Sequence, residues 1–367
     1  MIFAEDLIKT IKKNKINFFT GVPDSILKKL SIHLDKKDKY NHIMSTNEGS
    51  SIALATGYHL STKKIPAVYL QNSGLGNAIN PLISVTHQKV YSIPMLLIIG
   101  WRGAPKYPDE PQHEAQGKIT KKMLSLLGID HCVLRSKNDL KKISKLVISA
   151  KNNNKPVACL IEKGQLLSKN NKKLLKKNKN YFLRSYAIEK ILENIKPKTH
   201  IISTTGYTSR ELHQIRKDKN IKNGKDFYMV GGMGHTSMIG LTSSIFSKNE
   251  ILCLDGDGAV LMHLGALALN GHFANKNFKH IIFNNSAHES VGGQKTLGDK
   301  INFKKLSLGF NYKNYYSANS KKTFNKKLKF FLNSKGPSLF EIKVDLGSIK
   351  NLSRPKNLTQ VKNNFKK

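Results

Sequence analysis

Short apolar segments alternate along the chain with stretches that carry the periodicity of amphipathic helices, and this alternation constrains the fold more than any other feature. The predicted strands are residues 67–70, 95–99, 157–161, 201–203, 251–254, 280–283 and 339–344. The predicted helices are residues 6–14, 24–34, 50–60, 139–150, 185–194 and 261–270. Because such alternation builds strand–helix–strand crossovers, the sequence predicts an α/β fold of doubly wound, mostly parallel sheets.

A segment rich in Lys and Asn interrupts the alternation near the middle of the chain. Residues 166–182 lack a sustained hydrophobic period and are predicted to form a linker. They separate residues 1–165 from residues 183–367, and each part has the size of one ordinary domain. We therefore expect two domains, each built on one sheet. The final residues, 356–367, are polar and are expected to fray.

Polar side chains follow two of the predicted strands in the second domain. A Gly-Asp-Gly turn centred on Asp257 comes just after strand 251–254, and an Asn-Asn pair that ends at Asn285 comes directly after strand 280–283. The carboxyl ends of parallel strands face the ligand crevice of such a sheet, and glycines let the backbone approach a phosphate closely. A carboxylate, an amide and carbonyl oxygens suit Mg²⁺. Two unrelated turns are the alternative interpretation.

This combination resembles the diphosphate-binding motif of thiamine-diphosphate-dependent enzymes. The resemblance implies the thiamine-diphosphate-binding fold, with a pyrimidine-binding first domain and a diphosphate-binding second domain. It also implies thiamine diphosphate as the cofactor, with Mg²⁺ held by Asp257, Asn285 and the Ala287 carbonyl. The cofactor contacts that it implies in this region are Gly256, Asp257, Gly258, Ala259 and Asn285.

The same resemblance requires a glutamate in the first domain that hydrogen-bonds the aminopyrimidine ring and so promotes deprotonation of the thiazolium. Glu48 fits this position because small residues follow it at the start of a predicted helix. A glutamate is also favoured in any first helical turn by the helix dipole, which is the structural alternative.

Further segments resemble cofactor contacts of the same family. One contains Gly232, Met233, Gly234 and His235. There Met233 is implied to wedge between the two rings of the cofactor, although a methionine that fills a core gap is the alternative. Asn72 belongs to a Gly-rich turn, residues 72–77, that resembles an active-site turn of the family.

The chain has room for only two domains, a layout that resembles the phosphonopyruvate and sulfopyruvate decarboxylases within this family. Stretches similar to the former are residues 20–25, 71–77, 91–95, 100–103, 109–113, 204–212 and 288–294. Gly232 departs from the pattern, where serine is expected, and Lys295 stands where proline is expected. A single chain favours phosphonopyruvate, because sulfopyruvate decarboxylases are commonly split into two subunits.

The activity implied is non-oxidative decarboxylation of phosphonopyruvate to phosphonoacetaldehyde and CO₂, in the biosynthesis of phosphonates such as 2-aminoethylphosphonate. Sulfopyruvate or another small anionic 2-oxo acid is the alternative substrate. A cofactor- or polyanion-binding protein without turnover is the alternative of another class. The family places its cofactor between two subunits, which implies a homodimer or a larger homo-oligomer.

Three side chains are candidates for moving protons during the reaction: Asp24, His113 and Glu289. Asp24 follows a proline and could equally cap a helix. His113 could be an ordinary surface histidine, and Glu289 precedes two glycines of a possible closing loop. The second anion of the substrate calls for a cation, for which Arg102, Arg210 and Lys295 are available. The sequence does not choose among them.

The net charge of +38 comes almost entirely from scattered lysines. Since arginine, the usual reader of base edges and phosphates, is scarce, we expect no nucleic-acid partner. No apolar stretch is long enough to span a membrane, and the first residues do not resemble a signal peptide. The three cysteines are far apart, without metal or disulfide spacing, which favours a cytoplasmic protein.

Overall fold

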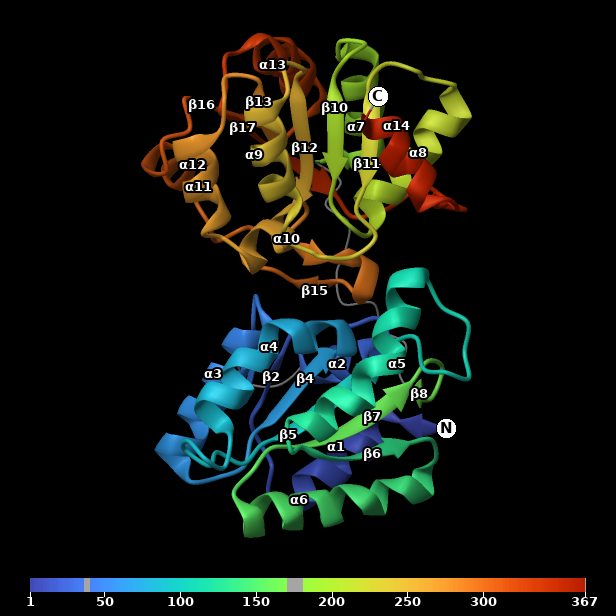
Figure 1. The fold of residues 1–367 in the computed structure, drawn as a ribbon, viewed down its shortest axis with the longest axis vertical. Coiled ribbons are helices and arrows are strands. Elements are labelled where there is room, and N and C mark those ends of the chain that lie inside the picture. Colours follow the sequence, from blue (N-terminus) through green and yellow to red (C-terminus); the bar gives the residue numbers. More distant parts are fainter. Residues whose placement is uncertain (36–39, 170–180, 367) are drawn as a thin grey trace. The chain divides into compact units, whose positions relative to one another are not determined.

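The computed structural model describes residues 1–35, 40–169 and 181–366, which form two compact units (Figure 1). Unit 1 comprises the described residues up to 169 together with Val291–Gln294. Unit 2 comprises residues 181–290 and 295–366. The domain limits drawn from the sequence stay a prediction, because most of the predicted linker 166–182 lies outside the described residues.

Unit 1 is built on a parallel sheet with the strand order β3-β2-β4-β5-β7-β6. The strands are β2 (Phe19–Gly21), β3 (His42–Met44), β4 (Ala67–Gln71), β5 (Leu96–Trp101), β6 (Asp130–Leu134) and β7 (Val157–Glu162). A separate parallel pair joins β1 (Ile2–Phe3) to β8 (Leu166–Leu167), so the predicted linker begins with an ordered strand. Because β2 lies between β3 and β4, the carboxyl ends of β2 and β4 meet at a switch point of the sheet.

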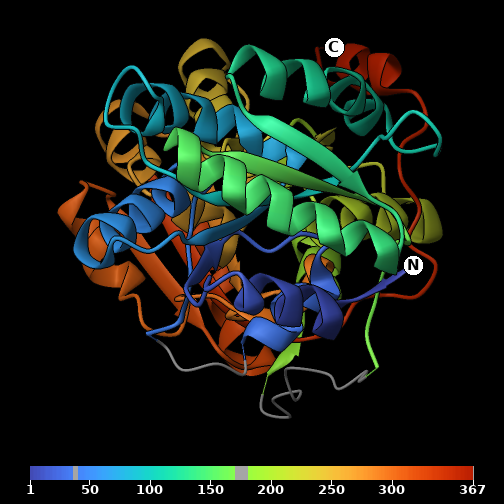
Figure 2. The ribbon, with the colours of Figure 1, turned by 90° about the horizontal axis from the view of Figure 1, so that it is seen from below.

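Helices cover both faces of the unit 1 sheet (Figure 1). They are α1 (Ala4–Lys13), α2 (Lys28–Leu34), α3 (Glu48–Thr62), α4 (Leu75–Pro81), α5 (Pro111–Leu126) and α6 (Lys141–Asn153). Apolar side chains of α1, α2 and α6 pack in one core, and those of α3, α4 and α5 pack in another. Figure 2 brings α1 (blue) and α6 (green) to the front. This is the doubly wound architecture predicted from the sequence.

Unit 2 repeats the architecture with the order β11-β10-β12-β13-β17-β16, and β9 adds to β17. Every pairing is parallel. The strands are β9 (Phe182–Leu183), β10 (His200–Ser203), β11 (Lys225–Tyr228), β12 (Ile251–Gly256), β13 (Phe278–Asn284), β16 (Asn314–Ala318) and β17 (Ser338–Asp345). Two further short strands are β14 (Ala287–His288) and β15 (Gln294–Lys295).

The helices of unit 2 also divide between two cores. They are α7 (Arg184–Asn194), α8 (Tyr207–Lys219), α9 (Thr236–Phe246), α10 (Asp257–Met262), α11 (Ala266–Phe273), α12 (Phe303–Gly309), α13 (Lys321–Asn333) and α14 (Leu358–Lys366). Side chains of α7, α8 and α13 pack in one core, and those of α10, α11 and α12 pack in the other. Within the described ranges, no helix is long and apolar enough to cross a membrane.

The predicted strands are all present, each within two residues of its predicted limits. The sequence missed β3, β6, β11 and β16, which are the outermost strands of the two main sheets, and the three-residue strand β2. Residues of β11 are all only half buried. An edge strand needs less apolar surface than a central one, so its sequence carries a weaker signal.

Two predicted helices and the predicted frayed end differ from the structure. The helix expected at 261–270 is broken between α10 and α11, because the backbone of His263 leaves the helical region. The helix expected from residue 24 begins only at Lys28. The end of the chain forms α14, whose Phe365 ring lies 4.7 Å from the His200 ring and 5.7 Å from the Phe227 ring.

Phe365→Ala is expected to lower the free energy of unfolding by about 1–2 kcal/mol, because a partly buried aromatic ring loses its packing on strands β10 and β11. Phe330→Ala is the matched control, since that ring is 61% exposed on α13. Its effect should stay within about 0.5 kcal/mol. Urea unfolding followed by circular dichroism compares the two. Equal stability of both variants would show that α14 contributes no packing.

Candidate active site

The candidate metal ligands lie at the carboxyl ends of adjacent strands in unit 2. Gly256, the last residue of β12, is paired in register with Phe283 of β13. Asp257 therefore opens α10 beside the Asn284-Asn285 turn that ends β13. The two strands place together the carboxylate and the amide that the sequence singled out.

Asp257 is a buried acid whose charge has little compensation. Its side chain accepts a hydrogen bond from the Thr296 hydroxyl. Burial raises the pKa of Asp257 to about 6, against the lowering effect of the Thr296 hydrogen bond. In the described part of the chain, no salt bridge reaches this carboxylate, so a divalent cation would supply the missing positive charge.

The Asn-Asn pair divides into a scaffold residue and a candidate ligand. Asn284 is fully buried and donates from Nδ2 to the Gly298 carbonyl (2.8 Å) and to Glu341 (2.8 Å). Asn285 is only half buried, and its Oδ1 accepts the Ala287 N–H at 3.1 Å. Carboxylate, amide and carbonyl oxygens at this turn are the donors that Mg²⁺ prefers, so the residues present fit the ion. Their roles as ligands stay a prediction.

The segment around Gly234 lies against the helix that Asp257 opens. A Cβ added to Gly234 (φ +89°) would lie 3.0 Å from the Ala259 carbonyl and 2.5 Å from the His263 ring. The rings of His235 and His263 stack with centroids 4.4 Å apart. The structure thus brings together Gly234, His235 and Ala259, which the sequence named separately. It adds His263, which the sequence missed because that residue was assigned to the interior of one continuous helix.

Three other predicted cofactor contacts have informative surroundings. Met233 is only partly buried and lies outside both hydrophobic cores of unit 2, so core packing does not explain it. Gly232 has φ +63°, a conformation that disfavours the serine expected there. A Cβ on Gly258 would lie 2.8 Å from the His288 ring. Burial lowers the pKa of that histidine to about 4.

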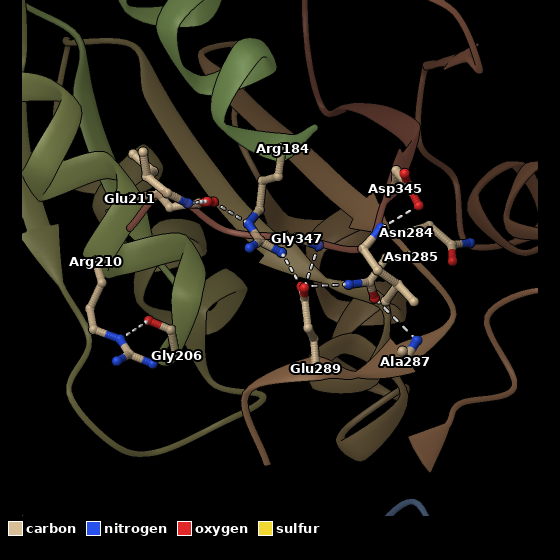
Figure 3. Close-up of polar contacts among 12 residues, drawn as sticks. Arg184, Gly206, Arg210, Glu211, Asn284, Asn285, Ala287, Glu289, Asp345 and Gly347 are labelled. Atoms are coloured by element: carbon tan, nitrogen blue, oxygen red, sulfur yellow. Dashed lines mark hydrogen bonds and ion pairs between the residues drawn. The ribbon is translucent and has the colours of Figure 1, made fainter. Parts of the chain in front are cut away.

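Glu289 lies in an ionic network rather than in an open position (Figure 3). Its Oε2 accepts from Asn285 Nδ2 (3.1 Å) and from Arg184 (3.5 Å). Its Oε1 accepts the Gly347 N–H. Arg184 also donates to Glu211 at 2.6 Å, and both of these side chains are buried. The sequence carried no signal for Arg184, and Glu211 entered only as part of the family-like stretch 204–212, with no role assigned.

Glu48 opens α3 in unit 1 and is 6% exposed. Its Oε2 accepts a hydrogen bond from Asn77 Nδ2 at 2.8 Å. A Cβ on Gly74 would lie 2.4 Å from Oε1, so only glycine allows this approach. Burial raises the pKa of Glu48, and the hydrogen bond from Asn77 acts in the opposite direction. The helix dipole favours an exposed, ionised glutamate in a first turn. It does not account for a buried carboxyl group with a raised pKa.

In the turn at residues 72–77, the last residue, Asn77, contacts Glu48, and the first residue, Asn72, does not. Asn72 donates to the Arg102 carbonyl (2.9 Å) and to Thr120 (2.9 Å), and it accepts the Arg102 N–H at 3.0 Å. These contacts make Asn72 a scaffold residue that joins β4 to the end of β5. Its predicted contact with the cofactor has no support here, and Asn77, which the sequence did not select, touches Glu48 instead.

Asp24 caps the turn that leads into α2. Its Oδ2 accepts the N–H groups of Ile26 (3.1 Å) and Leu27 (3.0 Å), as an N-cap does. The side chain is 1% exposed, and burial raises its pKa despite the hydrogen bond from Leu27 N. Asp24 therefore caps the turn before α2 and not α2 itself, whose N-cap residue is Leu27. It also has the environment of a carboxyl group that can retain a proton, so its catalytic role stays a prediction.

The candidate substrate-binding cations and His113 differ in the contacts that their side chains make. Arg102 binds Asp109 with two nitrogens and donates to Ser25 at 3.1 Å. Arg210 lies 4.7 Å from the centre of the Tyr207 ring, and Lys295 is exposed. His113 lies in the first turn of α5 rather than in a loop, with a partly buried side chain. The structure does not select one cation for the substrate.

Comparisons with known proteins cover both parts of the chain. Residues 1–125 match the family model described as the thiamine pyrophosphate enzyme, N-terminal TPP binding domain. Residues 204–342 match the corresponding C-terminal TPP binding domain. The phosphonopyruvate decarboxylase of Streptomyces viridochromogenes is 30% identical over 97% of this chain and 92% of its own length. That of Streptomyces hygroscopicus is 30% identical over 97% of this chain and 91% of its length.

A sulfopyruvate decarboxylase is also similar. The protein of Methanosarcina acetivorans is 26% identical over 80% of this chain and 78% of its own length. That single protein matches across most of the present chain. A single chain therefore does not by itself separate the two kinds of decarboxylase, contrary to the expectation from the sequence.

Asp257→Asn is expected to stabilise the cofactor-free protein at neutral pH while removing a predicted metal ligand. The folded pKa of about 6 exceeds the ordinary value of 3.8, so this carboxylate costs stability as the pH rises through that interval. The variant should match the wild type near pH 4 and be more stable by about 2–3 kcal/mol at pH 7. Chemical unfolding without metal across this pH range measures the difference. A difference independent of pH would contradict the buried, uncompensated charge.

Proposed function

The chain belongs to the thiamine-diphosphate-dependent decarboxylase family, and from this membership we propose that it decarboxylates phosphonopyruvate to phosphonoacetaldehyde and CO₂ with Mg²⁺ as the metal. The observation that carries the proposal is the 30% identity, over 97% of the chain, to two phosphonopyruvate decarboxylases. The aldehyde would feed phosphonate biosynthesis, and we place the reaction in the cytoplasm. Sulfopyruvate is the second candidate substrate, supported by the 26% identity over 80% of the chain.

Thiamine diphosphate, when bound, supplies the electron sink for the carbanion that CO₂ loss leaves behind. Asp257, Asn285 and the Ala287 carbonyl would hold the Mg²⁺ that neutralises the diphosphate. Glu48 would hold the aminopyrimidine ring. Burial raises the pKa of Glu48, which favours the protonated carboxyl form that can donate a hydrogen bond.

Asp24 and His113 are our candidates for proton transfer to the product. Asp24 is buried with a raised pKa, which suits a group that must hold a proton and then release it. A phosphonate dianion needs a cationic partner, and Arg102, Arg210 and Lys295 stay our candidates. Arg102 already binds Asp109 with two nitrogens, which leaves it less available for the substrate.

We propose a homodimer or a larger homo-oligomer, with the cofactor between the first domain of one subunit and the second domain of another, as in the family. The surface of unit 2 supports association. Helices α9 and α11 carry large apolar side chains that are exposed in the single chain: Ile239, Ile245, Phe246, Leu269 and Phe273. Contiguous helices with such side chains are typical of an association surface.

The substrate is tested by measuring CO₂ release from phosphonopyruvate, sulfopyruvate and pyruvate side by side. We expect the highest kcat/KM with phosphonopyruvate, and a value at least about 100-fold lower with pyruvate, which lacks the second anion that the site must otherwise leave unpaired. A preference for sulfopyruvate would establish the second candidate. Binding of thiamine diphosphate without turnover of any of the three would favour a non-catalytic binding protein.

Subunit mixing tests the assembly. Glu48→Gln and Asp257→Asn chains should each be inactive alone, since each damages one end of the same cofactor site. In a mixed dimer one site collects both changes and the other collects neither. An equal mixture with random exchange should regain about a quarter of the wild-type activity. Verified exchange without recovery would show that each site is built within one chain.

A further inference from the structure

Glu289 has both carboxylate oxygens occupied by N–H donors. The Gly347 N–H reaches Oε1, while Arg184 and Asn285 reach Oε2 at 3.5 and 3.1 Å. Figure 3 shows these donors converging on one carboxylate. A group that exchanges protons with a substrate needs a carboxylate oxygen that the substrate can reach. Within the described residues, both oxygens of Glu289 already accept N–H hydrogen bonds, so its surroundings suit a fixed acceptor.

Such an acceptor determines which way the Asn285 amide faces. A side-chain amide can place its oxygen or its nitrogen on a given side with little difference in shape. An ionised carboxylate only accepts hydrogen bonds, so Nδ2 must face Glu289. Oδ1 consequently faces the opposite side, where it accepts the Ala287 N–H at 3.1 Å. This is the oxygen that a cation bound by Asn285 would contact.

Arg184 connects this carboxylate to the rest of unit 2. It is the first residue of α7 and is 5% exposed. Its Nε donates to Glu211 Oε2 at 2.6 Å, and the other oxygen of Glu211 accepts the Ile349 N–H at 3.1 Å. Burial raises the pKa of Glu211, and Arg184 acts in the opposite direction. Arg184 thus partly compensates the charges of Glu211 and Glu289, whose carboxylates accept the Ile349 and Gly347 N–H groups.

We propose that Arg184, Glu211 and Glu289 form a positioning network that orients the Asn285 amide for Mg²⁺, and that Glu289 does not carry protons in the reaction. The inference rests on the proposed role of Asn285 as a magnesium ligand. Glu289 and Arg184 act through Asn285 and touch neither substrate nor cofactor in this scheme. Groups that orient metal ligands in this way typically change metal affinity by 10- to 100-fold when they are removed.

The main experiment titrates Mg²⁺ into protein saturated with thiamine diphosphate, by isothermal titration calorimetry. Glu289→Gln is nearly isosteric, but its amide must turn a donor toward Gly347 or toward Asn285 and Arg184. We expect the Kd for Mg²⁺ to rise by about 10- to 100-fold. Arg184→Lys keeps the positive charge but cannot donate to Glu211 and Glu289 from two separate nitrogens. This variant should also raise the Kd for Mg²⁺.

The matched control is Glu162→Gln in unit 1. Glu162 is 1% exposed and is bound by two nitrogens of Arg135, at 3.0 and 2.8 Å, whereas one nitrogen of Arg184 reaches Glu289 at 3.5 Å. This control removes an arginine–carboxylate ion pair without touching Asn285, so it should leave the Kd for Mg²⁺ unchanged. Thermal melting of the cofactor-free proteins should show a similar loss for Glu289→Gln and for the control. An unchanged Kd in Glu289→Gln would overturn the proposal.

A pH profile separates positioning from proton transfer. At saturating Mg²⁺ and cofactor, the kcat of Glu289→Gln should keep the shape of the wild-type profile. Loss of one limb of the profile with an unchanged Kd would make Glu289 a proton carrier.

Asn285→Ala separates the proposed metal role of Asn285 from the proposed positioning network. If it leaves the Kd for Mg²⁺ unchanged, the proposed metal role fails; if it weakens binding while Glu289→Gln does not, only the network fails.

Discussion

The parallel register of β12 and β13 is the constraint on which the candidate metal site depends. It places Gly256 beside Phe283, so the residues that follow these strands, Asp257 and Asn285, emerge at the same edge of the sheet. Close contacts then enclose the carboxylate: a Cβ on Gly298 would lie 2.5 Å from Asp257 Oδ2. The result is a closely packed, buried acid whose ionised form is costly, and the proposed Mg²⁺ would compensate this charge.

The central strands could be predicted from the sequence because a strand covered on both faces must be apolar at successive positions. Residues of β13 and nearly all of β17 are buried, and both strands were found. The outermost strands, such as β11 and β16, are half solvated and mix polar with apolar residues, so no local pattern marks them. Their pairing follows from the sheet and not from their own composition.

In the candidate site too, a local sequence pattern marks some residues and not their contact partners. Asp257, Asn285 and Glu48 were singled out from the sequence because each stands at a fixed place relative to a predicted strand or helix, and their roles stay predictions. Their partners were not, because the contacts join distant segments: Glu48 to Asn77, and Asn285 through Glu289 to Arg184. Gly232 shows a further limit. Glycine stands there in place of the expected serine, and the backbone has a positive φ, which sequence patterns do not display.

Arginine pairing distinguishes two classes of carboxylate in the described part of the chain. Asp109, Glu162, Glu211 and Asp226 each receive hydrogen bonds from an arginine, which compensates their charge and fixes a loop or a strand end. Glu48, Asp24 and Asp257 are as deeply buried, yet backbone, amide or hydroxyl groups are their hydrogen-bond donors, and burial raises the pKa of each. Against burial, hydrogen bonds from Arg102 lower the pKa of Asp109, whereas burial keeps the pKa of Glu211 raised in spite of Arg184. An arginine partner favours the ionised form of a carboxyl group, which suits a scaffold. Glu289, bound by Arg184, belongs with the first class. We therefore expect the chemistry of the proposed site to depend on the acids that the fold buries without arginine.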